Sequence, residues 1–235
     1  SIIRKLKLTN SIYFNQRLFD GKLPFGSGGI VDLKRSFWGY KLNMNFKGLL
    51  NYDLGLSYNS QKDDRQRFIN DEGVKTDQVM GQYENYENIS LYFFGSKSIQ
   101  RFNFSVGARL ENNIISMESY FNPVEKKIKK INSFNPSINI LYELNKIDLF
   151  GNFSSGYETP TLNELSATAN QSGFNENLKT IKSNTFEFGF ANFRTNQTVN
   201  YSLRLFNIST SNEITPYQLS DGLVLYRNAG KTIKR

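Results

Sequence analysis

The stretch GNFSSGYETPTLNELSATANQSGFNENLKTIKSNTFEFGF, residues 151–190, decides the fold because it combines two strand patterns with an intervening loop. Aromatic residues alternate with small or polar ones over 152–157, and Pro160 then stops the pattern because proline cannot donate to a strand ladder. The second strand repeats the alternation at Phe186, Phe188 and Phe190. Each strand therefore has one apolar face and one small or polar face.

The same period-two alternation recurs along the rest of the chain. It is clearest over 40–46 and 50–58, where tyrosine, leucine, methionine and phenylalanine alternate with lysine, asparagine, aspartate, serine and glycine. Together these patterns predict about ten strands. The predicted strands are residues 4–14, 40–46, 50–58, 83–94, 102–111, 134–143, 147–156, 186–191, 199–206 and 223–231.

The connections between the predicted strands alternate between long and short. Short turns are predicted at 47–48, 95–99, 145–146 and 194–196, and long polar loops at 16–36, 61–79, 112–132, 157–182 and 209–222. Membrane barrels have this arrangement, with short turns at one rim and longer loops at the other. A soluble sandwich would not place every long loop at the same end of its strands. The pattern therefore favours an all-β, antiparallel transmembrane β-barrel, with a soluble all-β domain as the alternative.

Composition fits a barrel and excludes several other classes. Only 38% of the residues are hydrophobic while 14% are aromatic, which is typical of strands with a single apolar face. No apolar run reaches the roughly 18 residues of a membrane helix. The chain has no His and no Cys, which removes imidazole bases, catalytic triads, thiolate metal sites and disulfides. We therefore expect a protein that is not an enzyme and that needs no cofactor.

The opening stretch also resembles a known family. Gly156-Tyr157, Pro160-Thr161, Glu164-Leu165, Asn177-Leu178-Lys179, Ser183 and Phe186-Glu187-Phe188-Gly189 are similar to a run of motifs in the barrel of TonB-dependent outer-membrane receptors. The Arg227-Asn228-Ala229-Gly230 run resembles a motif that these receptors carry where a strand returns to the periplasmic side.

The resemblance implies a 22-stranded barrel that encloses a plug domain. About ten strands would make residues 1–235 a partial barrel domain, and nothing in the sequence resembles the plug or a TonB-contacting segment. The sequence begins with Ser1 rather than Met, which also suggests a fragment. Since an open sheet edge is not stable in lipid, we expect the remaining strands to come from elsewhere in the protein.

The function that the resemblance implies is import of a scarce ligand across the cell outer membrane with energy from TonB. A ferric siderophore complex is the leading ligand, with cobalamin, haem, copper and glycans as alternatives. A passive porin and a soluble β-sheet binding module remain alternative functions. We expect contact with outer-membrane lipid and lipopolysaccharide but no nucleic-acid partner, because the aromatic residues lie on regular apolar strand faces rather than beside the basic ones.

Two sets of charged residues are candidate site residues. The first set lies on polar strand faces, which would face the lumen and line a ligand path or hold the plug: Arg109, Glu111, Glu187 and Arg204. The second set is basic and falls in predicted extracellular loops, where the net charge of +8 would favour an anionic chelate: Arg65, Arg67, Lys126, Lys127, Lys129 and Lys130. The alternatives are internal pairing for the first set, and simple solvation or contact with lipopolysaccharide phosphates for the second.

Overall fold

The computed structural model describes residues 5–24, 26–48, 50–121, 126–166, 174–192, 199–219 and 224–234. These residues contain ten strands and one short helix. The strands are β1 (Lys5–Lys22), β2 (Ile30–Lys47), β3 (Asn51–Asp71), β4 (Val74–Ile99), β5 (Phe102–Ser119), β6 (Lys127–Glu143), β7 (Asp148–Glu158), β8 (Ile181–Asn192), β9 (Tyr201–Gln218) and β10 (Val224–Lys234), and the helix is α1 (Leu162–Ser166). Among the described residues no helix is long and apolar enough to cross a membrane.

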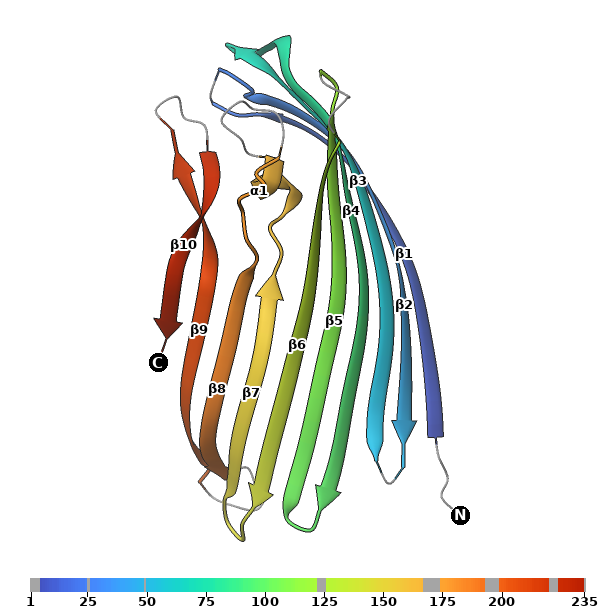
Figure 1. Cartoon of the computed structure of the whole chain (residues 1–235), viewed down its shortest axis with the longest axis vertical. Helices are drawn as coiled ribbons and strands as arrows, with labels where there is room; N and C mark the ends of the chain where they lie inside the picture. The colour runs from blue at the N-terminus through green and yellow to red at the C-terminus, as the bar shows by residue number, and fades with distance from the viewer. Residues whose placement is uncertain are drawn as a thin grey trace.

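All ten strands form a single sheet in chain order, from β1 to β10, and every neighbouring pair is antiparallel. The sheet is tall and curved, and β1 and β10 are its two edges (Figure 1). The all-β class, the antiparallel arrangement and the number of strands are therefore as predicted, while closure into a barrel is not seen in this chain.

Several predicted loops are instead strand. Most of residues 16–36, 61–79, 112–132 and 209–222 continues the neighbouring strands, so β3 reaches 21 residues and β4 reaches 26. A strand needs only about 9–11 residues to cross a bilayer. The additional length is polar on much of both faces, so it shows no alternation even though most of its backbone is paired, with register shifts in β3 between Arg67 and Asn70.

The connections confirm some of the predicted alternation. β2 ends at Lys47 and β3 begins at Asn51, and a tight turn occurs at 144–147, close to the predictions, but the turn predicted at 95–99 is strand and the chain reverses at 100–101. The turn predicted at 194–196 lies outside the described residues. The β3–β4 connection is only Glu72-Gly73, and both residues have the positive φ that a two-residue type I′ hairpin requires.

The sheet has two ends and two faces, which differ in what they carry. The turn end is where β2 ends and β3 begins and where the tight turns at 100–101 and 144–147 lie, and the loop end is the opposite one. The inner face carries Glu84 and Ile115, and residues 159–166 and 174–180 between β7 and β8 pack on it (Figure 1). The outer face is the opposite one, and cross-strand partners share a face.

We call the part of the sheet near the turn end the turn-side region. Its outer face is a continuous apolar band. One register row joins Leu42, Leu56, Leu91 and Leu110, and the next row joins Met44, Leu54, Phe93 and Ala108. Leu91 and Leu110 are about half exposed, at 50% and 53%. Their neighbours along each strand are polar and face inward, as in the row of Lys41, Ser57, Ser90 and Glu111. Soluble monomers rarely expose an apolar patch of this extent.

Candidate functional site

The connection between β7 and β8 folds back onto the inner face, and we call its described residues 159–166 and 174–180 the inner segment. Its helix α1 begins with a capping box: the backbone N–H of Glu164 donates to Thr161 Oγ1 at 3.2 Å, and the Thr161 N–H donates to Glu164 Oε2 at 2.7 Å. The Pro160-Thr161 and Glu164-Leu165 motifs therefore start this helix and direct Leu165 into the protein, where it is fully buried.

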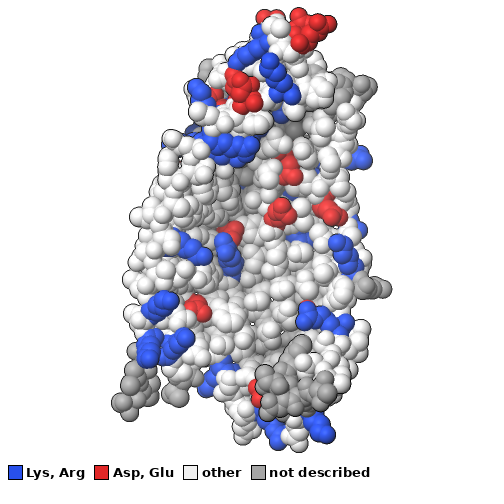
Figure 2. All heavy atoms as spheres, turned by 180° about the vertical axis from the view of Figure 1, so that it is seen from behind, with Lys and Arg blue, Asp and Glu red and all other residues white. Residues whose placement is uncertain are grey.

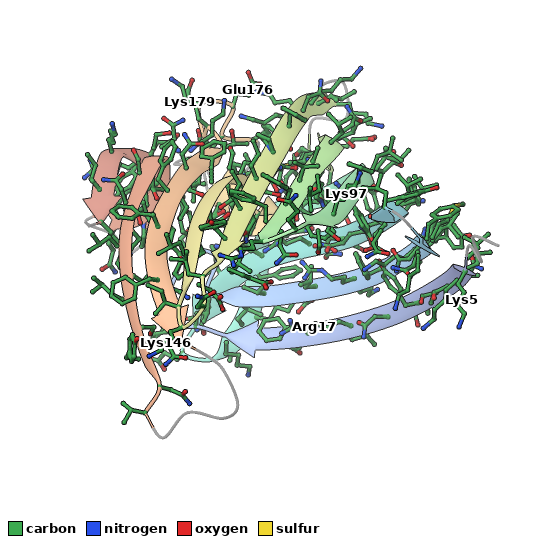
Figure 3. The ribbon with its side chains drawn as sticks, turned by 90° about the horizontal axis from the view of Figure 1, so that it is seen from below. Lys5, Arg17, Lys97, Lys146, Glu176 and Lys179 are labelled. Carbon is green, nitrogen blue, oxygen red and sulfur yellow. The ribbon has the colours of Figure 1, made fainter. Side chains whose placement is uncertain are left out.

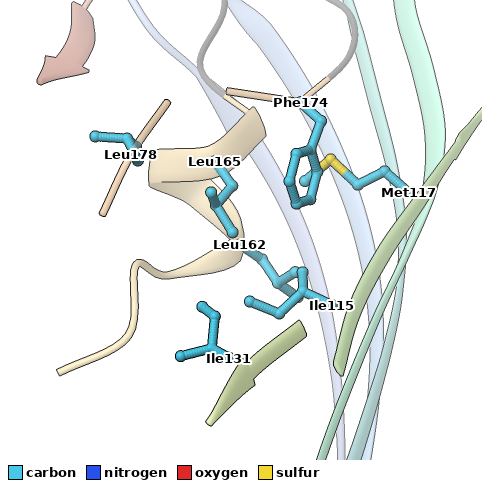
Figure 4. Close-up of a cluster of buried hydrophobic side chains, with 7 residues drawn as sticks. All are labelled: Ile115, Met117, Ile131, Leu162, Leu165, Phe174 and Leu178. Carbon is cyan, nitrogen blue, oxygen red and sulfur yellow. The ribbon is translucent and has the colours of Figure 1, made fainter. Parts of the chain in front are cut away.

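A small apolar cluster holds the inner segment against the sheet (Figure 4). The wall contributes Ile115 and Met117 from β5 and Ile131 from β6. The inner segment contributes the other members, which are Leu162, Leu165, Phe174 and Leu178. Burying each such side chain contributes about 1.5–3 kcal/mol, so the cluster is enough to fix the position of the segment.

Hydrogen bonds attach the segment to both sides of the interior. On β6, Lys129 Nζ donates to the carbonyl oxygens of Glu176 at 2.8 Å and Leu178 at 2.6 Å. On β10, Asn228 exchanges hydrogen bonds with the backbone of Lys179 at 2.8 and 3.0 Å, and Asn228 Nδ2 also donates to the carbonyl of Asn212. The segment thus connects β6 to β10 across the inner face.

Beside α1 lies a set of charged side chains, of which all but the partly exposed Arg35 are buried. We call this set the interior charge cluster, and its members are Arg35, Asp63, Arg65 and Glu84. Arg35 binds Asp63 with two hydrogen bonds, at 2.8 and 2.6 Å. Arg65 Nε lies 2.9 Å from Glu84 Oε1, and Arg65 Nη1 donates to Asn163 Oδ1 of α1 at 3.1 Å. Burial raises the pKa of the Glu84 carboxyl, and the charge of Arg65 opposes this shift. The cluster is well paired and joins α1 to β3 and β4.

Towards the turn end, a belt of polar side chains follows one register row across the inner face. Asn59 donates to Asn88 at 3.2 Å, and Asn88 donates to Asn113 at 2.8 Å. Asn113 donates in turn to the hydroxyl of Tyr157 at 2.7 Å, and Tyr157 donates to Glu111. By simple alternation Tyr157 belongs to the apolar outer face, but these hydrogen bonds place its hydroxyl at the inner face.

A pocket of about 410 Å³ lies between the interior charge cluster and α1. Its walls are Arg35, Gln61, Tyr86 and Ile115 from the sheet and residues 159–163 from the inner segment. Such a lining offers hydrogen-bond donors and one guanidinium to a small polar group. Within the described residues, no group of three or more acidic side chains is placed to hold a metal ion.

The four predicted lumen residues form two ion pairs on the inner face. Arg109 pairs with Glu111 along β5, and Arg204 of β9 lies 2.9 Å from Glu187 of β8. No hydrogen bond or ion pair joins one pair to the other within the described ranges. Figure 2 shows acidic and basic side chains in the middle of the face as well as towards its two ends.

The basic residues predicted in loops lie mostly in strands, which corrects that placement. Arg65 and Arg67 belong to β3, and Lys127, Lys129 and Lys130 to β6, while Lys126 immediately precedes β6.

Their surroundings differ. Arg65 is buried and paired, and Lys127 lies 3.3 Å from Glu176, whereas Lys126 and Lys130 are exposed. Glu176 and Lys179 lie far across the molecule from Lys5 and Arg17 on β1 (Figure 3).

Sequence reasoning missed the carboxylates and amides that organise this interior, chiefly Asp63, Gln82, Glu84 and Asn113. They fall in stretches that read as polar loops, or on the polar side of a predicted strand. Counting by twos from Ser57 would have placed Asp63 and Arg65 on the inner face, but only if the strand were known to continue.

The comparisons agree with this architecture. A family model described as the TonB-dependent receptor-like β-barrel matches residues 4–235. The ferric yersiniabactin uptake receptor FyuA from Yersinia pestis has a TM-score of 0.65 at 14% identity, over 98% of this chain and 36% of that one. The siderophore receptor PiuA from Acinetobacter baumannii has a TM-score of 0.66 at 12% identity, over 97% and 40%. The copper transporter OprC has a TM-score of 0.66 at 12% identity, over 95% and 38%.

The chain therefore spans about two fifths or less of the length of these structures. At such low identity the likeness concerns the fold, while the family model extends over nearly every residue. An open antiparallel sheet with an apolar outer band, a polar inner face and an inward-folded segment is what a portion of such a barrel would look like. The chain belongs to the TonB-dependent receptor-like β-barrel family.

Proposed function

We propose that this chain belongs to an outer-membrane receptor that imports a scarce ligand with energy delivered by TonB. The observation that carries the proposal is the match of the family model to residues 4–235. The apolar outer band supports placement in a membrane, because each row presents leucine, methionine or phenylalanine outward and polar groups inward. On this view the bilayer and lipopolysaccharide contact the outer face, and the ligand passes along the inner one.

A ferric siderophore complex is the ligand we propose. Two structural neighbours are named as receptors for ferric yersiniabactin and for a siderophore. A third neighbour is named as a copper transporter, which makes a copper complex the second candidate. Among the described residues no group of three or more acidic side chains could hold a metal ion, so we propose that the cargo is recognised through its organic moiety.

The inner-face ion pairs would line the path of that ligand. Glu111 connects to the belt through Tyr157, and the Arg204–Glu187 pair lies where β8 meets β9. We propose that both pairs keep the wall polar and wet without binding the ligand strongly. Among the basic side chains near the loop end, Lys126 and Lys130 are free to draw an anionic chelate towards the opening by screened attraction.

The test is uptake by cells that carry the intact receptor. Iron-starved cells with and without the receptor gene would be given radioactive iron as a panel of ferric siderophores, and radioactive copper in parallel. We expect receptor-dependent uptake of at least one ferric siderophore, abolished by deletion of TonB. Uptake that persists without TonB would instead indicate a passive porin, and uptake of copper alone would favour the second candidate.

A further inference from the structure

One guanidinium on the inner face at the loop end, that of Arg67, has no ionic partner among the described residues. The interior charge cluster contains two guanidinium groups and two carboxylates, and each of its cations has a carboxylate partner. Arg67 lies two residues beyond Arg65 on β3, so its side chain points to the same face and adds a third cation. Within the described residues Arg67 makes no ion pair and donates no hydrogen bond.

The surroundings of Arg67 make the lack of an ionic partner unusual. Its register partners are Val31 on β2 and Met80 on β4, and both are buried, at 6% and 2% exposure. Arg67 Nε is itself buried without a hydrogen-bond partner. Burial and, next, repulsion from Arg65 lower the pKa of the guanidinium. Arg67 as a whole is only partly buried, but withdrawing the Nε of its guanidinium from water without a partner is costly, so a fold that keeps it there normally supplies a counter-charge.

Two residues near Arg67 indicate the chemistry of the group that supplies the counter-charge. Gln82 of β4 is 1% exposed and lies in the next row on the same face, and its Oε1 is buried without a hydrogen-bond donor among the described residues. Tyr226 of β10 is close enough to interact electrostatically with Arg67. A guanidinium that shares a face with an unused acceptor and interacts electrostatically with a phenol matches an oxyanion that also carries a hydroxyl or N–H donor.

We infer that Arg67 is an anion-binding residue of the receptor interior and that the imported ligand presents a carboxylate or phenolate oxygen to it. The inference rests on the proposed function, since it takes the inner face as the ligand path. It also separates the basic candidates: Arg65 is neutralised by Glu84, Lys129 is used by the inner segment, and Arg67 keeps its charge available.

The experiment measures citrate, a small tricarboxylate probe, binding to the purified intact receptor, with glycerol as an uncharged comparison. We expect Arg67→Gln to weaken citrate binding about 10- to 100-fold, the range for loss of one charge-assisted hydrogen bond. Arg17→Gln is the matched control, because Arg17 is an exposed arginine in the row of Arg35. We expect this control to change citrate binding less than twofold.

A second variant keeps the test decisive if Arg67→Gln folds poorly. Arg67→Met removes the unpaired charge, so we expect it to unfold at an equal or higher temperature than wild type in citrate-free buffer, and to lose the stabilisation that citrate gives to wild type. Equal citrate affinity in wild type and both Arg67 variants would overturn the inference, as would an equal loss in Arg17→Gln.

Results that contradict the proposed function differ from results that contradict the inference about Arg67. In that case the intact receptor would import no ferric or copper complex, while citrate binding would still depend on Arg67. If instead import of ferric complexes is confirmed and Arg67→Gln leaves both citrate binding and uptake unchanged, the inference is wrong and the proposed function stands.

Discussion

We call the part of the sheet near the loop end the loop-side region. It is built from the same strands as the turn-side region, but the two regions bury opposite faces of the sheet. In the turn-side region, the apolar row of Leu56, Leu91 and Leu110 faces outward and polar residues face inward. In the loop-side region, Ile115 and Met117 of β5 face inward and are almost fully buried. There the outer face is polar, with Lys62, Asn85 and Ser116 in a single row.

The inversion occurs within single strands, so strand propensity does not explain it. What changes is the medium that each face meets. We attribute the outward apolar band to lipid, while the loop-side region buries its apolar residues against its own inner segment, as a soluble protein does. A single continuous ladder of backbone hydrogen bonds serves both regions.

The largest expected effect comes from breaking the ionic core of the loop-side region. Arg65→Met leaves Glu84 buried without its partner, and removing one member of a buried pair costs about 3–5 kcal/mol. Denaturant titration of the intact receptor would measure this loss, and Arg17→Met, which removes an exposed arginine, should cost less than about 0.5 kcal/mol.

The pH dependence of the same variant sharpens the test. Burial raises the pKa of Glu84 in the folded state, so folding takes up a proton as the pH falls and ionised Glu84 is the destabilising form. The loss of unfolding free energy caused by Arg65→Met should therefore become smaller as the pH is lowered from neutral to about pH 5. A deficit that grows on acidification would contradict our account of this cluster.

The next effect tests whether the inner segment is held by its apolar cluster. Leu165 is fully buried, and Leu165→Ala should lower stability by about 2–5 kcal/mol. Leu23→Ala, at a 39% exposed leucine near the loop end, is the control and should change little. Similar losses in the two variants would mean that the segment is not packed as described.

The outer band is tested by two adjacent residues of β5. Phe104 faces outward and Ser105 inward, in register with Ile140 and Asn139. Phe104→Arg should cost about 2–4 kcal/mol and block stable insertion, as judged by heat-modifiability on gels, because it places a charge on the lipid face. Ser105→Arg should insert normally, and equal behaviour of the two variants would refute the face assignment.

The smallest effect is expected on the inner face of the turn-side region. Glu187→Gln breaks the pair with Arg204, whose side chain is 62% exposed, so we expect about 0–1 kcal/mol. Stability measured by the same titration should therefore be nearly unchanged. A loss as large as that of Arg65→Met would show that this pair is shielded from water.

The contrast between the turn-side and loop-side regions also explains which parts of the structure could be predicted from the sequence. Near the turn end the two faces differ in polarity, so alternation located most strands and placed Phe104, Leu54 and Glu111 on the correct faces. In the loop-side region both faces carry polar side chains over stretches such as 61–67, and these were mistaken for loops.

The interior site was harder to predict because its residues come together only through the register. Asp63, Arg65 and Glu84 are unremarkable polar residues until β3 pairs with β4. Thr161 and Glu164 were noted only as part of the family resemblance, in a stretch predicted to be a loop, so neither the capping box nor the burial of Leu165 in the apolar cluster was predicted. A free charge such as that of Arg67 appears only once the partners of every neighbouring charge are known.

The most direct test of the inversion is a cysteine scan along β5, in a receptor in which any cysteine outside this cysteine-free stretch has first been replaced by serine. Each position from Phe102 to Ser119 of the intact receptor would carry a spin label in lipid vesicles, and its contact with oxygen dissolved in the lipid would be compared with its contact with an aqueous nickel reagent. We expect lipid contact at alternate positions from Phe102 to Leu110, none from Asn112 onward, and protection from both reagents at Ile115 and Met117. Lipid contact that continued with the same period to Ser119 would contradict the account.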